Sequence, residues 1–262
     1  MSSAPRIAVV IPCRDDAEFL DACLSALAAQ TRPADRIVVV DNASADGSAQ
    51  IARVHGVEVI DEPHVGIWPA AARGYDEVAG SADVIARLDA DSRPHPDWIE
   101  RIEAAFAADA TLGVLTGGAE FYGANRLVRY LGEHWYIGGG RFWVKAWLGI
   151  PLVFGSNFAM RAGIWLRVRT EVLRDDPRIH DDLDLTIHLT AADAVRWDRD
   201  LRMPVSARPL TTPFALAQRV GRVVTTFAAS WPRGSFRAAV RHSAPDDGTD
   251  AAGDGLSPRY GR

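Results

Sequence analysis

The chain of 262 residues has only two cysteines, Cys13 and Cys23, which are too few for a disulfide framework. Both lie in an apolar opening segment, so we expect buried free thiols in a reducing compartment. No run of about 18 uncharged apolar residues occurs, and no segment is therefore expected to span a bilayer. The opening letters MSSAPR lack the charged and then apolar pattern of a secretion signal. These absences predict a cytoplasmic protein.

Lysine is also nearly absent, because Lys145 is the only one, and acids are missing from two stretches. Residues 121–170 contain one acid, Glu133, and residues 208–245 contain six arginines and no acid. Such basic stretches attract anionic partners, although a general preference for arginine would give the same pattern. The net charge of −5 argues against a nucleic-acid-binding protein.

Short apolar runs alternate with amphipathic segments in the first half of the chain. Strands are expected at 6–11, 36–40, 57–60 and 84–88, and helices at 17–29, 45–54, 68–79 and 96–108. This alternation predicts an α/β fold with a Rossmann-like, mostly parallel sheet flanked by helices on both faces.

The alternation fades after residue 110. One more strand is expected within 111–121, residues 121–155 show no clean period, and a helix is expected from Asp182 to Ala194. An amphipathic basic segment follows at 214–231.

Polar residues follow three of the predicted strands: Pro12-Cys13-Arg14-Asp15, Asp41-Asn42 and Asp89-Ala90-Asp91. In parallel sheets, ligands bind at the carboxyl ends of the strands, so the three groups should share one rim. Two carboxylates one residue apart are suited to a hard divalent cation such as Mg²⁺ or Mn²⁺. Taken alone, the acids of LDAD, followed by two prolines, also fit an ordinary turn.

Several segments together resemble the family 2 glycosyltransferases in order and spacing over about residues 6–210. They are VVIPCRDDAEFLDACLSALAAQ, RIVVVDNASADGS, VGIWPAAARGYDEV, ARLDADSRPHPDWIERIEAAF, FGSNFAMR and HDDLDLTIHL. The resemblance implies a GT-A fold and an inverting, hexosyltransferase-type enzyme. Such an enzyme uses a nucleotide-diphospho-sugar donor and a divalent metal, Mn²⁺ or Mg²⁺.

The resemblance also assigns the donor side of the site. Asp41 would accept a hydrogen bond from the nucleotide base, and Arg73 would pair with the diphosphate. Pro12 and Arg14 lie in the first loop, which would meet the nucleotide. A turn-forming role for Asp41 and a solvated helix position for Arg73 remain the alternatives.

For the metal, the resemblance assigns Asp91 as the principal ligand, and Asp89 as a ribose contact that shares the metal. The base of an inverting transfer matches Asp182, which would take the proton of the acceptor hydroxyl. Asp181 stands where the family usually has Glu, and it would neighbour the base or contact the acceptor.

Acids at a helix start also cap the helix, and that role is assigned to Asp184 as capping or packing support. His180 is either a metal or acceptor contact or an ordinary partner of the acids beside it.

The acceptor side is expected in residues 121–170, where tryptophans alternate with arginines. Asn157, in GSNFAM, and Trp135 are assigned to the acceptor, although packing in the core would explain at least half of the tryptophans. An acceptor glycan, a lipid-linked sugar, a cell-envelope glycan precursor and a soluble small molecule or protein all remain open. Because the basic segment is amphipathic, we hypothesise that the enzyme visits the inner face of the cell membrane.

The predicted organisation has four parts. Residues 1–120 form the nucleotide-sugar half, and 121–212 the acceptor and catalytic-base half of the same GT-A domain. Residues 213–242 form amphipathic basic helices, and 243–262 a disordered tail.

A dinucleotide-dependent oxidoreductase is disfavoured because no G-x-G-x-x-G follows the first strand. A phosphatase that uses Asp-x-Asp as nucleophile is disfavoured because the motif follows the fourth strand. An inactive sugar-nucleotide-binding scaffold or partner subunit is the remaining alternative.

Overall fold

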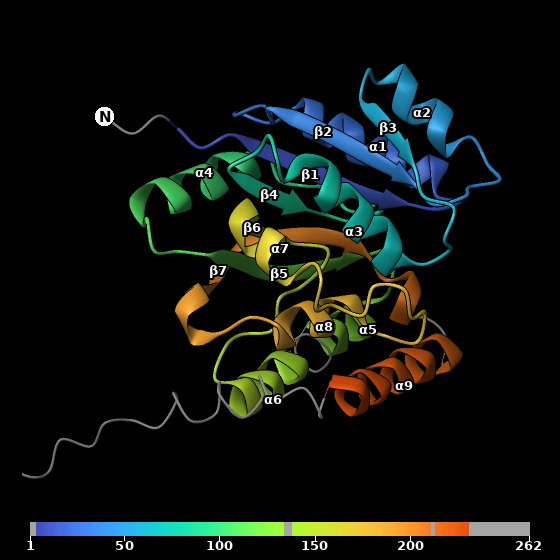
Figure 1. Cartoon of the computed structure of the whole chain (residues 1–262). Helices are drawn as coiled ribbons and strands as arrows, with labels where there is room; N and C mark the ends of the chain where they lie inside the picture. Colours follow the sequence, from blue (N-terminus) through green and yellow to red (C-terminus); the bar gives the residue numbers. More distant parts are fainter. Residues whose placement is uncertain (1–3, 134–137, 211–212, 231–262) are drawn as a thin grey trace, which may run out of the picture.

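The structure is a computed structural model that describes residues 4–133, 138–210 and 213–230. A seven-stranded sheet forms the centre of the protein, and its strands lie in the order β3-β2-β1-β4-β6-β5-β7 (Figure 1). The strands are β1 (Ile7–Cys13), β2 (Arg36–Asp41), β3 (Glu58–Asp61), β4 (Val84–Arg87), β5 (Val114–Tyr122), β6 (Phe158–Arg161) and β7 (Val195–Ser206). The helices are α1 (Ala17–Ala28), α2 (Ser48–Val54), α3 (Ile67–Val78), α4 (Trp98–Ala108), α5 (Arg126–Leu131), α6 (Gly138–Leu148), α7 (Ala162–Val168), α8 (Asp181–Ile187) and α9 (Pro213–Ser230).

Helices cover both faces of the sheet, which is why β1 is apolar and buried at every position. Alternate residues of β1 belong to different cores. Ile7 and Val9 pack with α1 and α4, whereas Ala8 and Val10 pack with α3, α7 and α8. The predicted α/β class with a mostly parallel, helix-flanked sheet is therefore confirmed.

One strand runs against the others in the middle of the sheet. β6 pairs antiparallel with β4 on one side and with β5 on the other. β1, β2 and β4 are parallel neighbours, so the residues that follow them reach the same edge of the sheet. This edge is the rim expected from the sequence.

The second half differs from the sequence expectation. The helix expected from Asp182 to Ala194 ends at Ile187, because a capping box formed by Thr190 and Asp193 starts a separate 3-10 turn. The chain then enters β7, which pairs parallel with β5 at the edge of the sheet. Residues 121–155, which have no clean period, contain α5 and α6.

α5, α6, α8 and α9 gather on one side of the sheet, at the end of the molecule away from β3 (Figure 1). Of the segment expected at 213–242, residues 213–230 form α9. The rest of that segment and the expected tail, 243–262, lie outside the described residues. Among the described helices, none has the length and apolar character needed to cross a membrane. Cys13 and Cys23 are buried free thiols, as expected.

Candidate active site

A cavity of about 230 Å³ opens between the end of β4, the start of α8, and helices α6 and α9. Its polar wall contains four of the acids singled out in the sequence, Asp89, Asp91, Asp181 and Asp182. Its other walls are largely apolar. The acids come from two segments about 90 residues apart in the chain, so the fold brings them together as the sequence analysis required.

A buried arginine joins the two acidic segments. Arg87, the last residue of β4, is 2% exposed. Its Nη1 donates to Asp181 Oδ2 at 2.6 Å, and its Nη2 donates to Asp89 Oδ1 at 3.1 Å. Asp182 Oδ1 lies 3.8 Å from Nη1. A buried charge is tolerated when it is paired in this way, so Arg87 fixes the acids in place.

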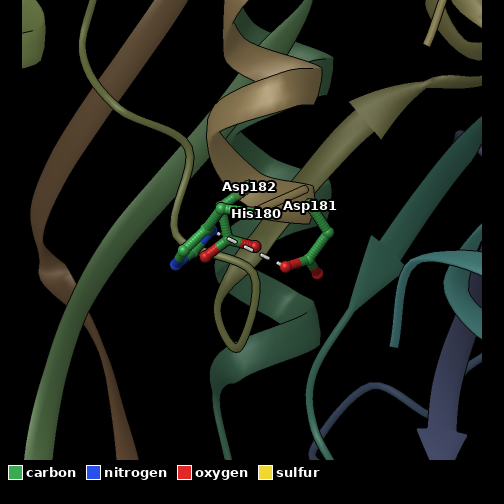
Figure 2. A group of neighbouring side chains, drawn as sticks. All are labelled: His180, Asp181 and Asp182. Atoms are coloured by element: carbon green, nitrogen blue, oxygen red, sulfur yellow. Dashed lines mark ion pairs between the residues drawn. The ribbon is translucent and has the colours of Figure 1, made fainter. Parts of the chain in front are cut away.

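The start of α8 supplies three converging polar side chains, His180, Asp181 and Asp182 (Figure 2). One ligand atom from each lies within 4.8 Å of the others, and an ion pair of 3.7 Å joins His180 to Asp181. The backbone N–H of His180 donates to the buried Thr226 hydroxyl of α9. α9 therefore anchors the turn that presents these acids.

The two neighbouring acids of α8 differ in proton affinity. Burial, and then the charge of Asp181, raise the pKa of Asp182 well above the ordinary carboxyl value. Burial opposes ionisation of Asp181 as well, but the guanidinium of Arg87 outweighs it and lowers the pKa of Asp181. The pair therefore holds one proton acceptor, Asp182, beside a carboxylate that stays ionised.

The loop before β6 closes against Asp182. A Cβ atom added to Gly155 would lie 2.0 Å from Asp182 Oδ1, so only glycine permits this approach. The next residue, Ser156, donates its hydroxyl proton to Asp89 Oδ2 at 2.6 Å. This short loop thus contacts both acidic segments.

Asp91 stands in a turn that side chains hold from two sides. The Ser92 hydroxyl accepts from the Asp89 backbone N–H, and the Tyr122 hydroxyl donates to the Asp91 carbonyl. Arg208 lies 3.5 Å from Asp91 Oδ2 and 2.8 Å from Asp16 Oδ1. Burial and the charge of Asp89 raise the pKa of Asp91 to about 6.

Two groups of side chains have the chemistry of a divalent cation site. The first is the pair Asp89 and Asp91, whose mutual repulsion a cation would relieve. The second is the cluster of His180, Asp181 and Asp182. Both line the same cavity, so the donor set fits a hard cation at this place.

Asp184 has a packing role, as the sequence analysis assigned it. It is fully buried, and its Oδ2 accepts from Trp68 Nε1 at 2.9 Å and from the Leu173 backbone N–H at 2.7 Å. His188, which ends α8, donates through Nδ1 toward the Asp184 carbonyl. These contacts fix α8 against α3.

Of the residues predicted for the donor, Asp89 lines this cavity, whereas Pro12, Arg14 and Asp41 lie on the expected rim outside it. Pro12 is buried in β1, Arg14 is exposed beside Asp15, and Asp41 ends β2. Asp41 Oδ1 accepts from the Ser44 backbone N–H, the turn contact weighed as its alternative. Arg73 pairs with Glu77 on the surface of α3, which fits the solvated helix position and gives it no place in the cavity.

Asn157, which the sequence analysis assigned to the acceptor, has the contacts of a packing residue. Its side chain is fully buried and takes part in three hydrogen bonds, with the Trp98 ring N–H and the carbonyls of Gly118 and Leu201. The Asn157 amide has no exposed surface and does not line the cavity, whereas the neighbouring Ser156 does. Trp135, the other acceptor residue expected, lies outside the described residues.

The sequence analysis missed Arg87, Gly155, Ser156 and Arg208. For Arg87 a signal was present, because a charged residue in the apolar strand VIARL must find a buried partner. The other three contact partners between 27 and 192 residues away in the chain. No local pattern reveals such contacts.

A family model described as "Glycosyl transferase family 2" matches residues 8–165, more than half of the chain. Glycosyltransferase AglE of Haloferax volcanii is 34% identical over 108 residues, which are 38% of this chain and 35% of AglE. The chain spans between about a third and a half of the length of the curated relatives that it matches.

Two solved structures share the fold. The mannosyltransferase PcManGT from Pyrobaculum calidifontis, in complex with GDP-Man and Mn²⁺, has a TM-score of 0.64 and 21% identity, covering 92% of this chain and 70% of that one. Glucosyl-3-phosphoglycerate synthase from Mycobacterium tuberculosis, in complex with Mn²⁺, UDP and glucosyl-3-phosphoglycerate, has a TM-score of 0.58 and 16% identity, covering 86% and 79%.

Proposed function

The chain belongs to glycosyl transferase family 2 and has the GT-A fold, and on that basis we propose that it is an inverting glycosyltransferase. It moves a sugar from a nucleoside-diphosphate donor to an acceptor hydroxyl, with Asp182 as the general base. The observation that carries the proposal is the cavity in which Asp89 and Asp91, at the end of β4, face Asp181 and Asp182 at the start of α8.

The donor occupies the rim formed by the ends of β1, β2 and β4. Pro12 and Asp41, at the carboxyl ends of the parallel neighbours β1 and β2, and Arg14, which follows β1, would receive the nucleoside. Arg208, which lies beside Asp91 and Asp16, would supply positive charge for the diphosphate. Arg73 has no part in this proposal.

Asp91, with Asp89, would hold a divalent cation, Mn²⁺ or Mg²⁺, because both carboxylates line the cavity and repel each other without one. The cation would neutralise the negative charge that develops on the departing diphosphate. The two solved relatives named above contain Mn²⁺ together with a nucleotide or nucleotide-sugar, which supports this choice.

The reaction follows from the position and proton affinity of Asp182. The acceptor hydroxyl attacks the anomeric carbon from the face opposite the diphosphate. A new C–O bond forms, the bond to the phosphate oxygen breaks, and the nucleoside diphosphate leaves. The proton of the hydroxyl passes to Asp182, whose raised pKa suits a general base. Arg87 keeps Asp181 ionised and in place beside it.

The acceptor enters from the side of α6 and α9. There the cavity has the apolar side chains Val144, Leu152 and Val223 together with two arginines, Arg141 and Arg222. Walls of this kind favour an amphiphilic acceptor with negative charge, such as a lipid-linked sugar or a cell-envelope glycan precursor.

The test is release of nucleotide from a panel of UDP-, GDP- and dTDP-sugars with Mn²⁺. We expect one donor to be turned over, and Asp182→Asn to lower the transfer rate by roughly a thousandfold while donor binding is retained. Asp176→Asn, an acid on the surface near Arg178, is the matched control and should be fully active.

Near-normal transfer by Asp182→Asn would overturn the assignment of the base. A nucleotide that stabilises the protein against heat without turnover of any donor would favour the alternative, an inactive binding scaffold or partner subunit.

A further inference from the structure

Helices α5 and α6 expose aromatic side chains that a helix in contact with water does not normally present. The described residues contain eleven exposed large hydrophobic side chains, and the four aromatic ones are Tyr130, Phe142, Trp143 and Trp147. All four lie on α5 or α6. Phe142 and Trp143 are each 65% exposed, although α6 is anchored through Val144 and Leu148 on its buried side.

The exposed aromatic side chains of α6 lie next to α9. Trp147 of α6 packs edge-on against Phe227 of α9, with ring centroids 5.3 Å apart, so the two helices are neighbours. Figure 1 shows α5, α6 and α9 together at the end of the molecule away from β3. Leu127, Leu131 and Val224 add exposed aliphatic surface from α5 and α9. We call this surface, formed by α5, α6 and α9, the aromatic face.

The aromatic face is also positively charged. Among the described side chains of its three helices, five are basic and none is acidic: Arg126, Arg129, Arg141, Lys145 and Arg222. Arg126, Arg129 and Lys145 are exposed, and in the described part of the chain no carboxylate lies within ion-pair distance of them. Such a surface attracts negative charge over about a Debye length.

We infer that the aromatic face docks on an anionic lipid bilayer. Tryptophan and tyrosine rings settle at the level of the lipid headgroups, and each basic residue near an anionic surface adds attraction. A second copy of this chain fits less well, because a symmetric contact through the same face would set the exposed Arg126, Arg129 and Lys145 against the same three residues of the other copy. The helices then lie on the membrane surface with their apolar side toward the acyl chains.

In the docked orientation, the side of the cavity formed by α6 and α9 lies next to the membrane surface. Gly140, Arg141 and Val144 of α6 and Arg222 and Val223 of α9 belong both to the helices of the aromatic face and to the cavity wall. A lipid-borne acceptor would therefore reach Asp182 without leaving the bilayer. The docking itself rests on the surface alone and holds whether or not the proposed transfer is correct.

The test is co-sedimentation of the full chain with vesicles of phosphatidylcholine and phosphatidylglycerol in equal parts, compared with vesicles of phosphatidylcholine alone. We expect binding to the anionic vesicles that weakens as salt is added. Trp143→Ser should lower the affinity at least about fivefold. Leu166→Ser, which removes an exposed apolar side chain from α7, is the matched control and should bind as the unaltered protein does.

A second pair of variants tests the charge. Lys145→Glu should weaken binding by about fivefold or more, the change that about 1 kcal/mol per basic residue near the membrane corresponds to. Arg53→Glu, an exposed arginine on α2, should leave binding unchanged.

Three outcomes would overturn the inference: no sedimentation with either vesicle, equal loss in Trp143→Ser and Leu166→Ser, or a dimer in solution that Trp143→Ser converts to a monomer. The last result would assign the aromatic face to a second copy. Thermal stabilisation of the protein by nucleotide-sugars with Mn²⁺, measured on the same samples, reports donor binding. This measurement distinguishes failure of the membrane-docking proposal from failure of the sugar-transfer proposal. Loss of vesicle binding with donor binding intact refutes only the docking, and vesicle binding without turnover of any donor refutes only the transfer.

Discussion

Arg87 is the single residue on which the geometry of the cavity depends most. Its guanidinium reaches Asp89 with one nitrogen and Asp181 with the other, and it also lies near the Tyr75 hydroxyl. A planar group with donors on two separate nitrogens can serve two carboxylates at once, which an ammonium group cannot do. The residue therefore sets the distance between Asp89, at the end of β4, and the acids at the start of α8.

Arg87→Lys keeps the charge and removes this two-sided contact. We expect the protein to fold, the transfer rate to fall by about a hundredfold, and the donor KM to change less than kcat, because the acids shift relative to each other. Arg161→Lys is the matched control, since Arg161 lies on the neighbouring strand β6 and bonds only to backbone carbonyls. Equal kcat values for the two variants would refute this role.

The raised pKa of Asp91 predicts that donor binding depends on pH. Its pKa is raised to about 6 by burial and by the charge of Asp89, so Asp91 gains a proton as the pH falls through that value. A protonated carboxyl is a poor metal ligand, and metal-dependent donor binding should therefore weaken below about pH 6. The check is the donor Kd measured between pH 5 and 8 with and without Mn²⁺.

Since protons and metal compete for the same carboxylate, more Mn²⁺ should move the midpoint of this transition to lower pH. A transition that does not respond to Mn²⁺ would show that another group controls it.

At the scale of elements, the loop before β6 and the start of α8 form one unit around Gly155. The Thr186 hydroxyl of α8 donates to the Asp182 carbonyl and accepts from the Val153 backbone N–H, which ties the loop to the helix. Asp182 fits against this loop only because Gly155 has no side chain.

Gly155→Ala should displace Asp182 and lower the transfer rate at least tenfold. Gly163→Ala is the matched control. A Cβ at Gly163 meets nothing within 4 Å, and alanine should stabilise helix α7 by about 0.5–1 kcal/mol with unchanged activity. The measurements are the unfolding temperature and the initial transfer rate of both variants. Full activity of Gly155→Ala would show that the loop can move to admit a Cβ atom without displacing Asp182.

The helices and strands of the first half could be predicted from the sequence because their buried residues recur with the regular spacing of a helix or a strand. The strand IAVVIPC is buried throughout, and α1 buries Leu20, Cys23, Leu24 and Leu27 at helical spacing. The second half resisted prediction for physical reasons. β7 is an edge strand with charged residues at several exposed positions, and α6 has apolar residues on its outer side. Neither shows the pattern of a half-buried element.

The convergence of the acids could be predicted from the sequence, but the contacts that hold them could not. Asp89, Asp91 and Asp182 stand in motifs that resemble those of the family, and the structure brings them to one cavity, while their roles in binding and catalysis stay predictions. The contacts of Arg87 and Ser156 join segments far apart in the chain. For Asn157 the motif indicated the region of the acceptor, but only the packing shows that Trp98 and two carbonyls occupy its amide.

At the scale of the whole molecule, a bound donor should act as a clamp between β1, β2 and β4. A ligand that binds only the folded state, present at a hundredfold excess over its Kd, stabilises a protein by about 2.7 kcal/mol. We therefore expect the correct nucleotide-sugar with Mn²⁺ to raise the unfolding temperature by roughly 5–10 °C.

Asp91→Asn should remove most of this rise, because the metal loses a ligand. Asp109→Asn, an exposed acid at the end of α4, should show the full rise and is the matched control. A rise of the same size in Asp91→Asn would exclude this residue from the metal.

The guanidinium of Arg87 also bears on any effort to redesign the enzyme. Since the same group contacts Asp89 and Asp181, we expect a substitution near Asp89 that is chosen to admit a different sugar to displace Asp181 and the neighbouring Asp182 as well. Under the proposed mechanism, donor choice and turnover would then change together. Libraries that randomise the end of β4 together with the first turn of α8 should yield active variants more often than libraries that change either segment alone.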